Sequence, residues 1–251
     1  MEARKIIITG GATRIGAAIA KKLSGNKVEI VIHFNKSRTK AIALKKELEK
    51  NGTKIHLVKG NLNKEEDIRK IIKSSKKYLK YFDCLVNNAS MFENDKLENF
   101  SSESWDKHLN INLKAPALLT REFAKNVKGK NNNVINIIDQ RVFKLTPFFF
   151  SYTLSKTGLY TLTKTSAMSL APKIRVNGIA PGPTIKNKRQ SKIHFKKQFL
   201  ATPLKQQVNV NEIANAVDFF IKTSSITGQV ISIDSGQSLN WQTPDIMRGK
   251  E

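Results

Sequence analysis

Two residues able to exchange protons lie four positions apart in the middle of the chain, Tyr152 and Lys156 in the stretch YTLSK. Side chains at this spacing share one face of a helix, and a lysine charge beside a phenol favours the phenolate and lowers the tyrosine pKa. Asp139, thirteen residues before Tyr152, adds a carboxylate that can relay protons or accept hydrogen bonds. These three side chains have the chemistry of a proton-transfer site, although the Tyr-x-x-x-Lys spacing by itself is weak evidence for one.

A glycine-rich turn, TGGATRIG, follows an apolar stretch near the start of the chain. Small residues at Thr9, Gly10 and Gly16 would let a pyrophosphate approach backbone N–H groups and the positive end of a following helix. The turn also carries Arg14, where such loops usually have another glycine, and then Ile15. A guanidinium is tolerable there because the loop would surround anions, to which it offers planar donors. We therefore expect a dinucleotide cofactor.

The next apolar stretch, VEIVIHF, ends near His33 and continues as NKSR, with no acidic residue. Dinucleotide folds that select NAD place an Asp or Glu there for the ribose 2′-hydroxyl, whereas an arginine nearby suits a 2′-phosphate. Lys36 and Ser37 supply a charge and a hydroxyl donor, and Arg14 would meet the same phosphate or the pyrophosphate. The sequence therefore predicts NADPH, while Arg38 is assigned to the general lysine and arginine excess.

Regular elements must hold these groups, and the chain alternates short apolar runs with helical patterns. The predicted strands are residues 5–9, 28–34, 54–60, 83–89, 133–139, 174–180 and 229–234. The predicted helices are residues 17–24, 38–50, 64–77, 102–127 and 152–170. Strands that are apolar without strict alternation, and that alternate with helices, indicate a parallel sheet buried on both faces.

The predicted fold is a single α/β domain over residues 1–251, a doubly wound parallel sheet (Rossmann fold) of about seven strands with helices on both faces. Ligands of such folds bind at the carboxyl ends of the strands. Residues 184–207 follow the sixth strand and are polar, basic and weakly patterned. We expect this segment to form a lid over the site.

The composition limits the cellular setting. The first residues run directly into an apolar strand, which leaves no room for a secretory leader. No stretch reaches the roughly 18 apolar residues of a membrane span. The single cysteine, Cys84, has no disulfide partner and lies in an apolar run, so we expect a core residue of a reduced, cytoplasmic protein without membrane association.

The net charge of +24 raises the question of a nucleic-acid partner. The lysines are scattered over most predicted helices, however, which is typical of solvated helix faces. We expect no specific nucleic-acid binding, only nonspecific attraction of anionic small molecules. The histidines are too dispersed to indicate a metal site, and no Cys/His spacing suggests zinc. They are His33, His56, His108 and His194.

Taken together, the motifs resemble the short-chain dehydrogenase/reductase family over essentially the whole chain. The resemblance is carried, in order, by TGGATRIG, Asn61 in GNLN, NNAS, Asn112, YTLSK, NGIAPGP and IDSGQSL. It implies that Tyr152 and Lys156 are catalytic, with Tyr152 as the proton donor. It also implies that Asn112 supports a water linking the lysine to solvent, although an Asn in mid-helix can also be a local packing feature. It also implies a homotetramer.

The same resemblance implies which residues contact the cofactor. They are Thr9, Gly10, Arg14, Ile15, Gly16, His33, Lys36, Ser37, Asn61, Leu62, Asn88, Ala89, Tyr152, Lys156, Pro181 and Gly182. Among these, Asn61 would lie at the adenine edge, and Lys156 would also hold the nicotinamide ribose.

Three departures from the usual family pattern are similar to the pteridine reductases, a branch of this family. Arg14 replaces the middle glycine, Asp139 replaces the usual catalytic serine, and Phe92 follows NNAS. The resemblance implies NADPH-dependent reduction of a dihydropterin or dihydrofolate-type substrate to the tetrahydro form. Phe92 would offer the flat pterin an aromatic surface opposite the nicotinamide. Substrate contacts would come from Arg14, Ser90, Phe92, Asp139 and Tyr152, although Ser90 can equally be a serine that ends a strand.

Two other functions stay open. A carbonyl reductase such as 3-oxoacyl-carrier-protein reductase would keep the fold, and the basic stretch Lys186 to Lys197 would dock an acidic carrier protein. Against it, a carboxylate at Asp139 would repel the charge that develops on a ketone oxygen. A non-enzymatic protein that binds NADPH or nucleic acid is supported only by the net charge.

Two aromatic features have open roles. The run Phe148 to Phe150 either lines the pocket or packs at a subunit interface, and Trp241 is expected in a tail that reaches a neighbouring subunit. Trp105 is expected to pack its helix against neighbouring elements. The sequence does not determine which pterin is used, because the pterin side chain would be recognised by residues 184–207. It also does not separate a primary folate-pathway enzyme from a salvage reductase.

Overall fold

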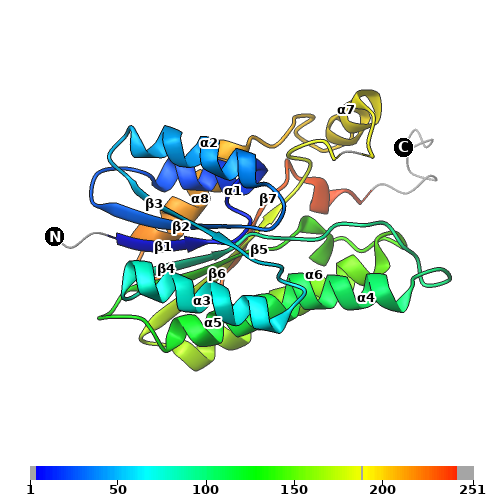
Figure 1. The fold of residues 1–251 in the computed structure, drawn as a ribbon. Helices are drawn as coiled ribbons and strands as arrows, with labels where there is room; N and C mark the ends of the chain where they lie inside the picture. Colours follow the sequence, from blue (N-terminus) through cyan, green and yellow to red (C-terminus); the bar gives the residue numbers. More distant parts are fainter. Residues whose placement is uncertain (1–3, 188, 242–251) are drawn as a thin grey trace, which may run out of the picture.

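The computed structural model describes residues 4–187 and 189–241. The strands are β1 (Arg4–Ile8), β2 (Val28–Phe34), β3 (Lys54–Lys59), β4 (Cys84–Asn87), β5 (Asn132–Ile137), β6 (Ile174–Pro181) and β7 (Val230–Ile233). The helices are α1 (Arg14–Leu23), α2 (Arg38–Glu49), α3 (Glu65–Leu79), α4 (Ser102–Leu109), α5 (Ala115–Ala124), α6 (Phe150–Leu170), α7 (Lys192–Leu200) and α8 (Val210–Lys222). Figure 1 labels these elements.

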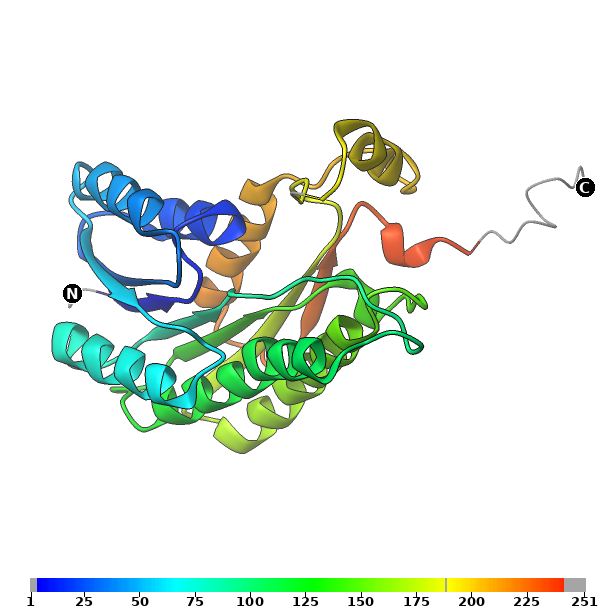
Figure 2. The same cartoon turned by 45° about the vertical axis from the view of Figure 1, so that its right-hand side comes forward.

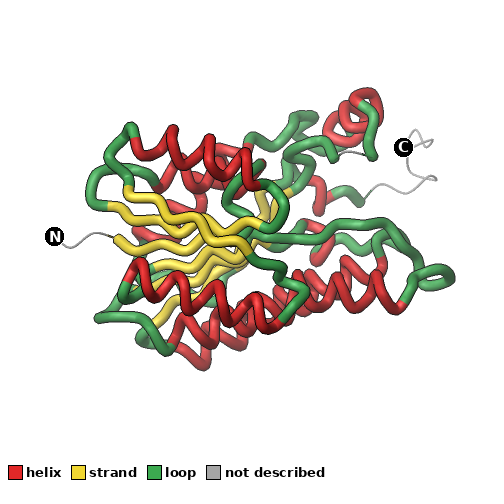
Figure 3. Tube along the Cα trace, viewed as in Figure 1, coloured by secondary structure: helices red, strands yellow, loops and turns green. Residues whose placement is uncertain are grey.

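The strands form one parallel sheet in the order β3-β2-β1-β4-β5-β6-β7. This order confirms the predicted doubly wound fold. It reverses between β1 and β4, so the loops that follow these two strands separate there, which is where such sheets bind ligands. In Figure 1, β1 runs from the N-terminus at the left toward the right-hand side of the view, where Figure 3 shows long loops in green.

Helices cover both faces of the sheet. α1, α2 and α8 lie on one face, and α3, α5 and α6 lie on the other, as Figures 1 and 2 show from two directions. Ile6 and Ile8 pack toward the first layer and Ile7 toward the second, and all three are fully buried. The strands are therefore continuously apolar because both of their faces are covered.

All five predicted helices have different ends in the structure, and three of the differences bear on the candidate site. The first begins at Arg14 rather than at Ala17. The predicted helix over residues 102–127 is divided into α4 and α5 by a π-helical turn, and α5 ends at Ala124. The helix expected from Tyr152 begins at Phe150, so Tyr152 lies within its first turn.

Two helices were not predicted from the sequence. α7 lies inside residues 184–207, and its sequence has no clear apolar face, since Phe195 is its buried residue while Ile193 is 71% exposed. α8 did carry a signal, because Asn209 and Glu212 form a capping box at its start. Figure 2 shows α7 standing out from the rest of the molecule.

Candidate active site

The glycine turn lies where β1 ends, beside the end of β4. Gly10 adopts φ 60, in the left-handed region that favours glycine. A Cβ at Gly16 would lie 2.3 Å from the Gly10 carbonyl oxygen, so the turn requires glycine there. The Thr9 hydroxyl accepts hydrogen bonds from the backbone N–H groups of Asn88 at 2.9 Å and Ala89 at 3.1 Å. The two strand ends are thereby held together at the position where the sheet order reverses.

Arg14 connects this turn to the predicted lid. It begins α1 with φ 55, a conformation costly for a residue with a Cβ, which gives a physical reason why glycine is usual at this place. Its guanidinium donates to the carbonyl oxygens of Ile185 at 2.8 Å and Lys186 at 3.1 Å, and burial lowers its pKa. Ile15 packs against the core beneath α1.

His33 and Leu62, both expected at the cofactor, direct their side chains inward. His33 is buried, its Nδ1 accepts the Gly10 N–H at 3.2 Å, and its Nε2 lies 3.1 Å from the Gly60 carbonyl oxygen. Burial lowers the pKa of His33 to about 4, so the neutral ring joins the two loops. The Leu62 side chain is buried in the core beside α3. Both side chains therefore lie beneath the loops expected to bind the cofactor, where they hold these loops against the core.

The residues expected at the 2′-phosphate and the adenine lie beyond the ends of β2 and β3. Lys36 is exposed, and Ser37 is the N-cap residue of α2. The Asn61 backbone N–H donates to Asp67 Oδ2 at 2.9 Å, which fixes the loop after β3. A hollow of about 320 Å³ lies there, lined by Asn35, Lys59, Gly60, Asn61, Lys64 and Asp67.

Three predicted catalytic residues meet where β5 ends and α6 begins. The Tyr152 hydroxyl donates to Asp139 Oδ2 at 2.8 Å. The Lys156 ammonium, one turn further along α6, donates to the Ile137 carbonyl oxygen at 2.8 Å. Tyr152 is 4% exposed and Lys156 is 1% exposed. The site therefore contains a tyrosine–carboxylate pair with a buried lysine beside it.

The pKa of Tyr152 moves in the opposite direction from the one that the sequence suggested. Burial, together with the Asp139 charge and hydrogen bond, raises it well above the ordinary value. The Lys156 ammonium donates to Ile137 and lies 5.8 Å from the centre of the Tyr152 ring, so its charge does not outweigh these effects. Burial lowers the pKa of Lys156 to about 8, against the opposing effect of Asp139. Tyr152 therefore keeps its proton at neutral pH, as a proton donor must.

Asn112 lies in the π-helical turn between α4 and α5 and is fully buried. Such turns re-aim side chains and are frequent at functional sites. Its amide oxygen accepts from the Met91 N–H at 2.9 Å and the Ser90 hydroxyl at 3.2 Å, and its amide nitrogen donates to the Ser155 hydroxyl at 3.0 Å. Asn112 thus ties the loop after β4 to α6, and it keeps Ser90 near Tyr152, whose pKa the Ser90 hydrogen bond lowers.

Phe92 belongs to an aromatic wall beside Tyr152. Its ring stacks on Phe149, with centroids 4.4 Å apart and an interplanar angle of 3°, and meets Tyr152 edge to face at 4.7 Å. Phe149 has φ 58, a strained conformation for a bulky residue and one that clusters at functional sites. The Arg189 guanidinium, from residues 184–207, donates to the Phe92 carbonyl oxygen.

The run Phe148 to Phe150 divides between two environments. Phe149 belongs to the aromatic wall, whereas the Phe150 ring lies 6.0 Å from that of Trp105 and ties α6 to α4. Phe148 is 46% exposed. Phe149 therefore stacks on Phe92 beside Tyr152, Phe150 packs between helices, and the packing role expected for Trp105 is confirmed. Trp241 is 68% exposed, and the tail after it lies outside the described residues.

Pro181 ends β6 and Gly182 follows it, at the same edge of the sheet as the glycine turn. The Gly182 N–H donates to the Ile233 carbonyl oxygen at 2.9 Å. A Cβ at Gly182 would lie 2.6 Å from the Asp234 Cα, so the chain passes too close to the β7 end for a larger residue. This close approach directs the chain from β6 into residues 184–207, whose start Arg14 holds.

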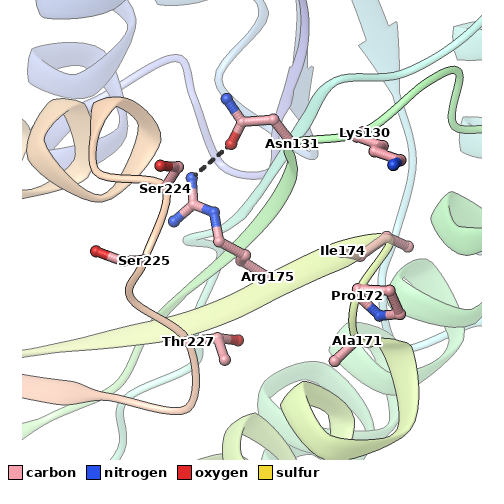
Figure 4. A pocket seen from close by; sticks show the side chains of 9 residues that line it. All are labelled: Lys130, Asn131, Ala171, Pro172, Ile174, Arg175, Ser224, Ser225 and Thr227. Atoms are coloured by element: carbon pink, nitrogen blue, oxygen red, sulfur yellow. Dashed lines mark hydrogen bonds between the residues drawn. The ribbon is translucent and has the colours of Figure 1, made fainter.

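A separate hollow of about 360 Å³ lies at the opposite edge of the sheet, where β5 and β6 begin (Figure 4). Its lining consists of Lys130, Asn131, Ala171, Pro172, Ile174, Arg175, Ser224, Ser225 and Thr227. The Arg175 guanidinium donates to Asn131 Oδ1 at 3.1 Å and to the Phe220 and Ile221 carbonyl oxygens at the end of α8. Arg175 therefore stabilises a helix end.

Other side-chain chemistry is sparse in the described residues. Across residues 4–187 and 189–241, no cluster of three or more His, Cys, Asp or Glu side chains is arranged to hold a metal ion. Cys84 lies in β4, and burial raises its thiol pKa to about 12, which confirms a core role. The helices of the same residues include none with the length and apolarity to cross a bilayer.

The order of the motifs and their meeting at one sheet edge agree with a comparison to known families. The family model described as short chain dehydrogenase matches residues 4–197. The chain belongs to the short-chain dehydrogenase family. As a member of that family it is an oxidoreductase, and the resemblance drawn from the sequence is confirmed at the family level.

Among curated relatives, this short-chain dehydrogenase is 29% identical to glucose 1-dehydrogenase 2 of Bacillus subtilis, over 93% of this chain and 94% of the relative. It is 27% identical to a 3-oxoacyl-[acyl-carrier-protein] reductase of Synechocystis, over 94% and 97%. Among solved structures, FolM alternative dihydrofolate reductase 1 of Brucella canis, complexed with NADP, is 41% identical, with a TM-score of 0.92 over 96% of both chains.

Proposed function

We propose that this short-chain dehydrogenase is an NADPH-dependent reductase that converts a dihydropterin or dihydrofolate-type substrate to its tetrahydro form. The observation that carries the proposal is the Tyr152–Asp139 pair beside the Phe92 ring. A flat, polar bicyclic substrate needs an aromatic surface, a proton donor for its ring nitrogen and an acceptor for its N–H groups. The likeness to the Brucella canis protein named as an alternative dihydrofolate reductase supports the same substrate class.

The residues at the strand ends fit NADPH. The Gly16 Cα has no room for a Cβ, which is the close backbone packing that a pyrophosphate-binding turn requires. Lys36 is exposed beyond β2, where an acidic residue would select NAD. We assign the pyrophosphate to the glycine turn and Arg14, and the 2′-phosphate to Lys36 and Ser37. When bound, NADPH would supply the hydride for the reduction.

The protein side chains would manage the proton. Tyr152 holds a transferable proton at neutral pH, and Asp139 orients its hydroxyl. Reduction of a carbon–nitrogen double bond adds hydride at carbon and a proton at nitrogen, so Tyr152 would donate to the ring nitrogen and be left as phenolate. Lys156, cationic below about pH 8, would offset this charge. Phe92 would hold the flat ring in reach of the hydroxyl.

The test is an NADPH-oxidation assay on purified protein. Dihydrobiopterin, dihydromonapterin, dihydrofolate and an acetoacetyl thioester are offered in parallel, each with NADPH and with NADH. We expect turnover of a pterin or folate with NADPH and little with NADH. Turnover of the thioester alone would overturn the pterin proposal while leaving the family assignment intact.

A 3-oxoacyl-carrier-protein reductase is the second candidate. The Synechocystis relative carries that name, and Lys192, Lys196 and Lys197 on α7 are exposed to an acidic partner. Asp139 argues against it, because its carboxylate accepts the Tyr152 hydrogen bond at the place where a ketone oxygen would need a donor. Salt-sensitive binding of acidic carrier protein, measured by titration, would favour this candidate.

A further inference from the structure

Arg141 lies two residues after Asp139, in a short 3-10 turn over Gln140–Val142. The Asp139 side chain accepts the Arg141 backbone N–H at 2.9 Å, and the Arg141 guanidinium lies 3.5 Å from the same carboxylate oxygen, Oδ1. The other oxygen, Oδ2, accepts the Tyr152 hydroxyl. Arg141 therefore occupies one side of the carboxylate and leaves the other side for Tyr152.

The same guanidinium also contacts the aromatic wall. It lies 4.6 Å from the centre of the Phe149 ring and 5.4 Å from that of Phe92, within the range of a cation–π contact. Phe149 keeps a strained backbone, and such a conformation persists only where surrounding contacts hold it. The Arg141 side chain is only 15% exposed. The guanidinium thus joins the proton-transfer pair to the rings.

We propose that Arg141 is a positioning residue, which fixes the Asp139 carboxylate toward Tyr152 and holds the Phe92–Phe149 stack beside it. This inference deepens the proposed function and rests on it for the identity of the substrate. Arg141 acts through Asp139 and the rings, and it needs no contact with the reacting atoms. A planar guanidinium suits this double role because it can pair with a carboxylate in its plane and stack on a ring with its face.

The charges around Tyr152 show why Arg141 affects the proton. From β5 and the turn after it, Asp139 raises the pKa of Tyr152 and Arg141 lowers it. From the loop after β4, Ser90 also lowers it. Lys156 lies on the same helix, and the neutral His108 ring on α4 meets Tyr152 edge to face at 5.9 Å. Removing Arg141 therefore both frees the carboxylate and strengthens the hold of Tyr152 on its proton.

The first readout needs no substrate. Tyrosine labelled with ¹³C at Cζ gives one signal for each of the four tyrosines, and Tyr152→Phe identifies the relevant one. Asp139→Asn should shift this signal, because the hydroxyl loses its carboxylate acceptor. We expect Arg141→Met to shift it as well, with a smaller change in Arg141→Lys, which keeps the charge. Lys144→Met is the matched control, since it removes a nearby cation that donates only to the Asn240 carbonyl among the described contacts.

The second readout is a double-mutant cycle on turnover of whichever substrate the wild-type enzyme reduces. Arg141→Met should lower kcat by about 10- to 100-fold, as expected when a reacting group is misplaced, with the KM for NADPH little changed. Because part of the effect of Arg141 passes through Asp139, adding Arg141→Met to Asp139→Asn should cost less than it does in the wild type, and the remaining loss reports its contact with the rings.

Two results would overturn the assignment of Arg141. One is a Tyr152 signal that moves in Asp139→Asn but not in either Arg141 variant. The other is a double variant whose loss equals the product of the two single losses. If Arg141→Met fails to fold, both the tyrosine signal and the double-mutant cycle are measured with Arg141→Lys instead. Wild-type turnover of the thioester alone would end the pterin proposal, yet the labelled tyrosine would still decide the role of Arg141.

Discussion

The environment of Tyr152 raises the pKa of its hydroxyl and so favours the protonated form. The hydroxyl is buried and donates to Asp139, so its pKa lies well above the usual value. Tyr152→Phe removes the transferable proton and should lower kcat/KM by about 10²-fold or more. Initial rates of NADPH oxidation measure this, with Tyr160→Phe on the same helix as the control. Unchanged turnover in Tyr152→Phe would remove Tyr152 from the mechanism.

Lys156 sets a second expectation at the residue scale. Burial lowers its pKa to about 8, so its positive charge is present below that pH and is lost as pH rises through it. If that charge offsets the phenolate, kcat/KM should fall above about pH 8, because this ratio reports groups of the free enzyme. Lys156→Arg keeps its charge at high pH, so its kcat/KM should no longer fall above pH 8. Its maximal kcat/KM should be lower than that of the wild type. An alkaline limb that persists in Lys156→Arg would assign the titration to another group.

At the scale of elements, a buried charge joins three neighbouring strands. Glu29 of β2 lies directly between Lys5 of β1 and Lys54 of β3 in the register, and it pairs with both and with His56. Burial alone would raise its pKa, but Lys5, Lys54 and His56 outweigh that effect and lower it to about 2. Glu29 therefore stabilises the sheet fully above about pH 4.5, and this contribution is lost as pH falls toward 2.

Glu29→Gln should lower the free energy of unfolding by about 3 kcal/mol at pH 7, at roughly 1.4 kcal/mol per pKa unit. The difference from wild type should shrink as the pH is lowered from 4.5, which urea unfolding at several pH values would follow. Glu47→Gln is the control, because its pair with Lys21 is half exposed and should matter by less than about 0.5 kcal/mol. A pH-independent difference would contradict the assignment.

The elements that sequence could predict are those whose burial follows a local pattern. Ile6 to Ile8 are apolar at consecutive positions because both faces of the sheet are covered, so β1 can be predicted from the sequence alone. α7 cannot be predicted in this way, because its Ile193 and Leu200 side chains are exposed and its apolar residues do not follow a helical period. Residue type was enough to propose Asp139, Tyr152 and Lys156 as the catalytic set, but the raised pKa of Tyr152 depends on burial and on a hydrogen bond that only the fold creates.

At the scale of the whole molecule, the charge is unevenly distributed along the chain. No Asp or Glu occurs between Asp139 and Glu212, a stretch that includes α6 and residues 184–207. The positive charges of this stretch are therefore uncompensated within it. Two of them lie at the candidate site, Lys156 beside Tyr152 and Arg189 on the Phe92 carbonyl oxygen. Such a field raises the local concentration of anionic ligands and weakens with ionic strength.

Cofactor selection can be tested on the whole molecule without any substrate. A ligand that binds only the folded state stabilises it by about 2.7 kcal/mol at 100 times its Kd, which for a chain of this size raises Tm by roughly 5 to 10 °C. Because Lys36 and Ser37 lie where a 2′-phosphate is expected and no acid lies beside them, NADPH should give this shift and NADH at the same concentration much less. Lys36→Glu should shrink the NADPH shift and leave the NADH shift equal or larger, since the acid suits a free 2′-hydroxyl. Equal shifts with both nucleotides in the wild type would mean that the glycine turn, and not the end of β2, supplies most of the binding energy.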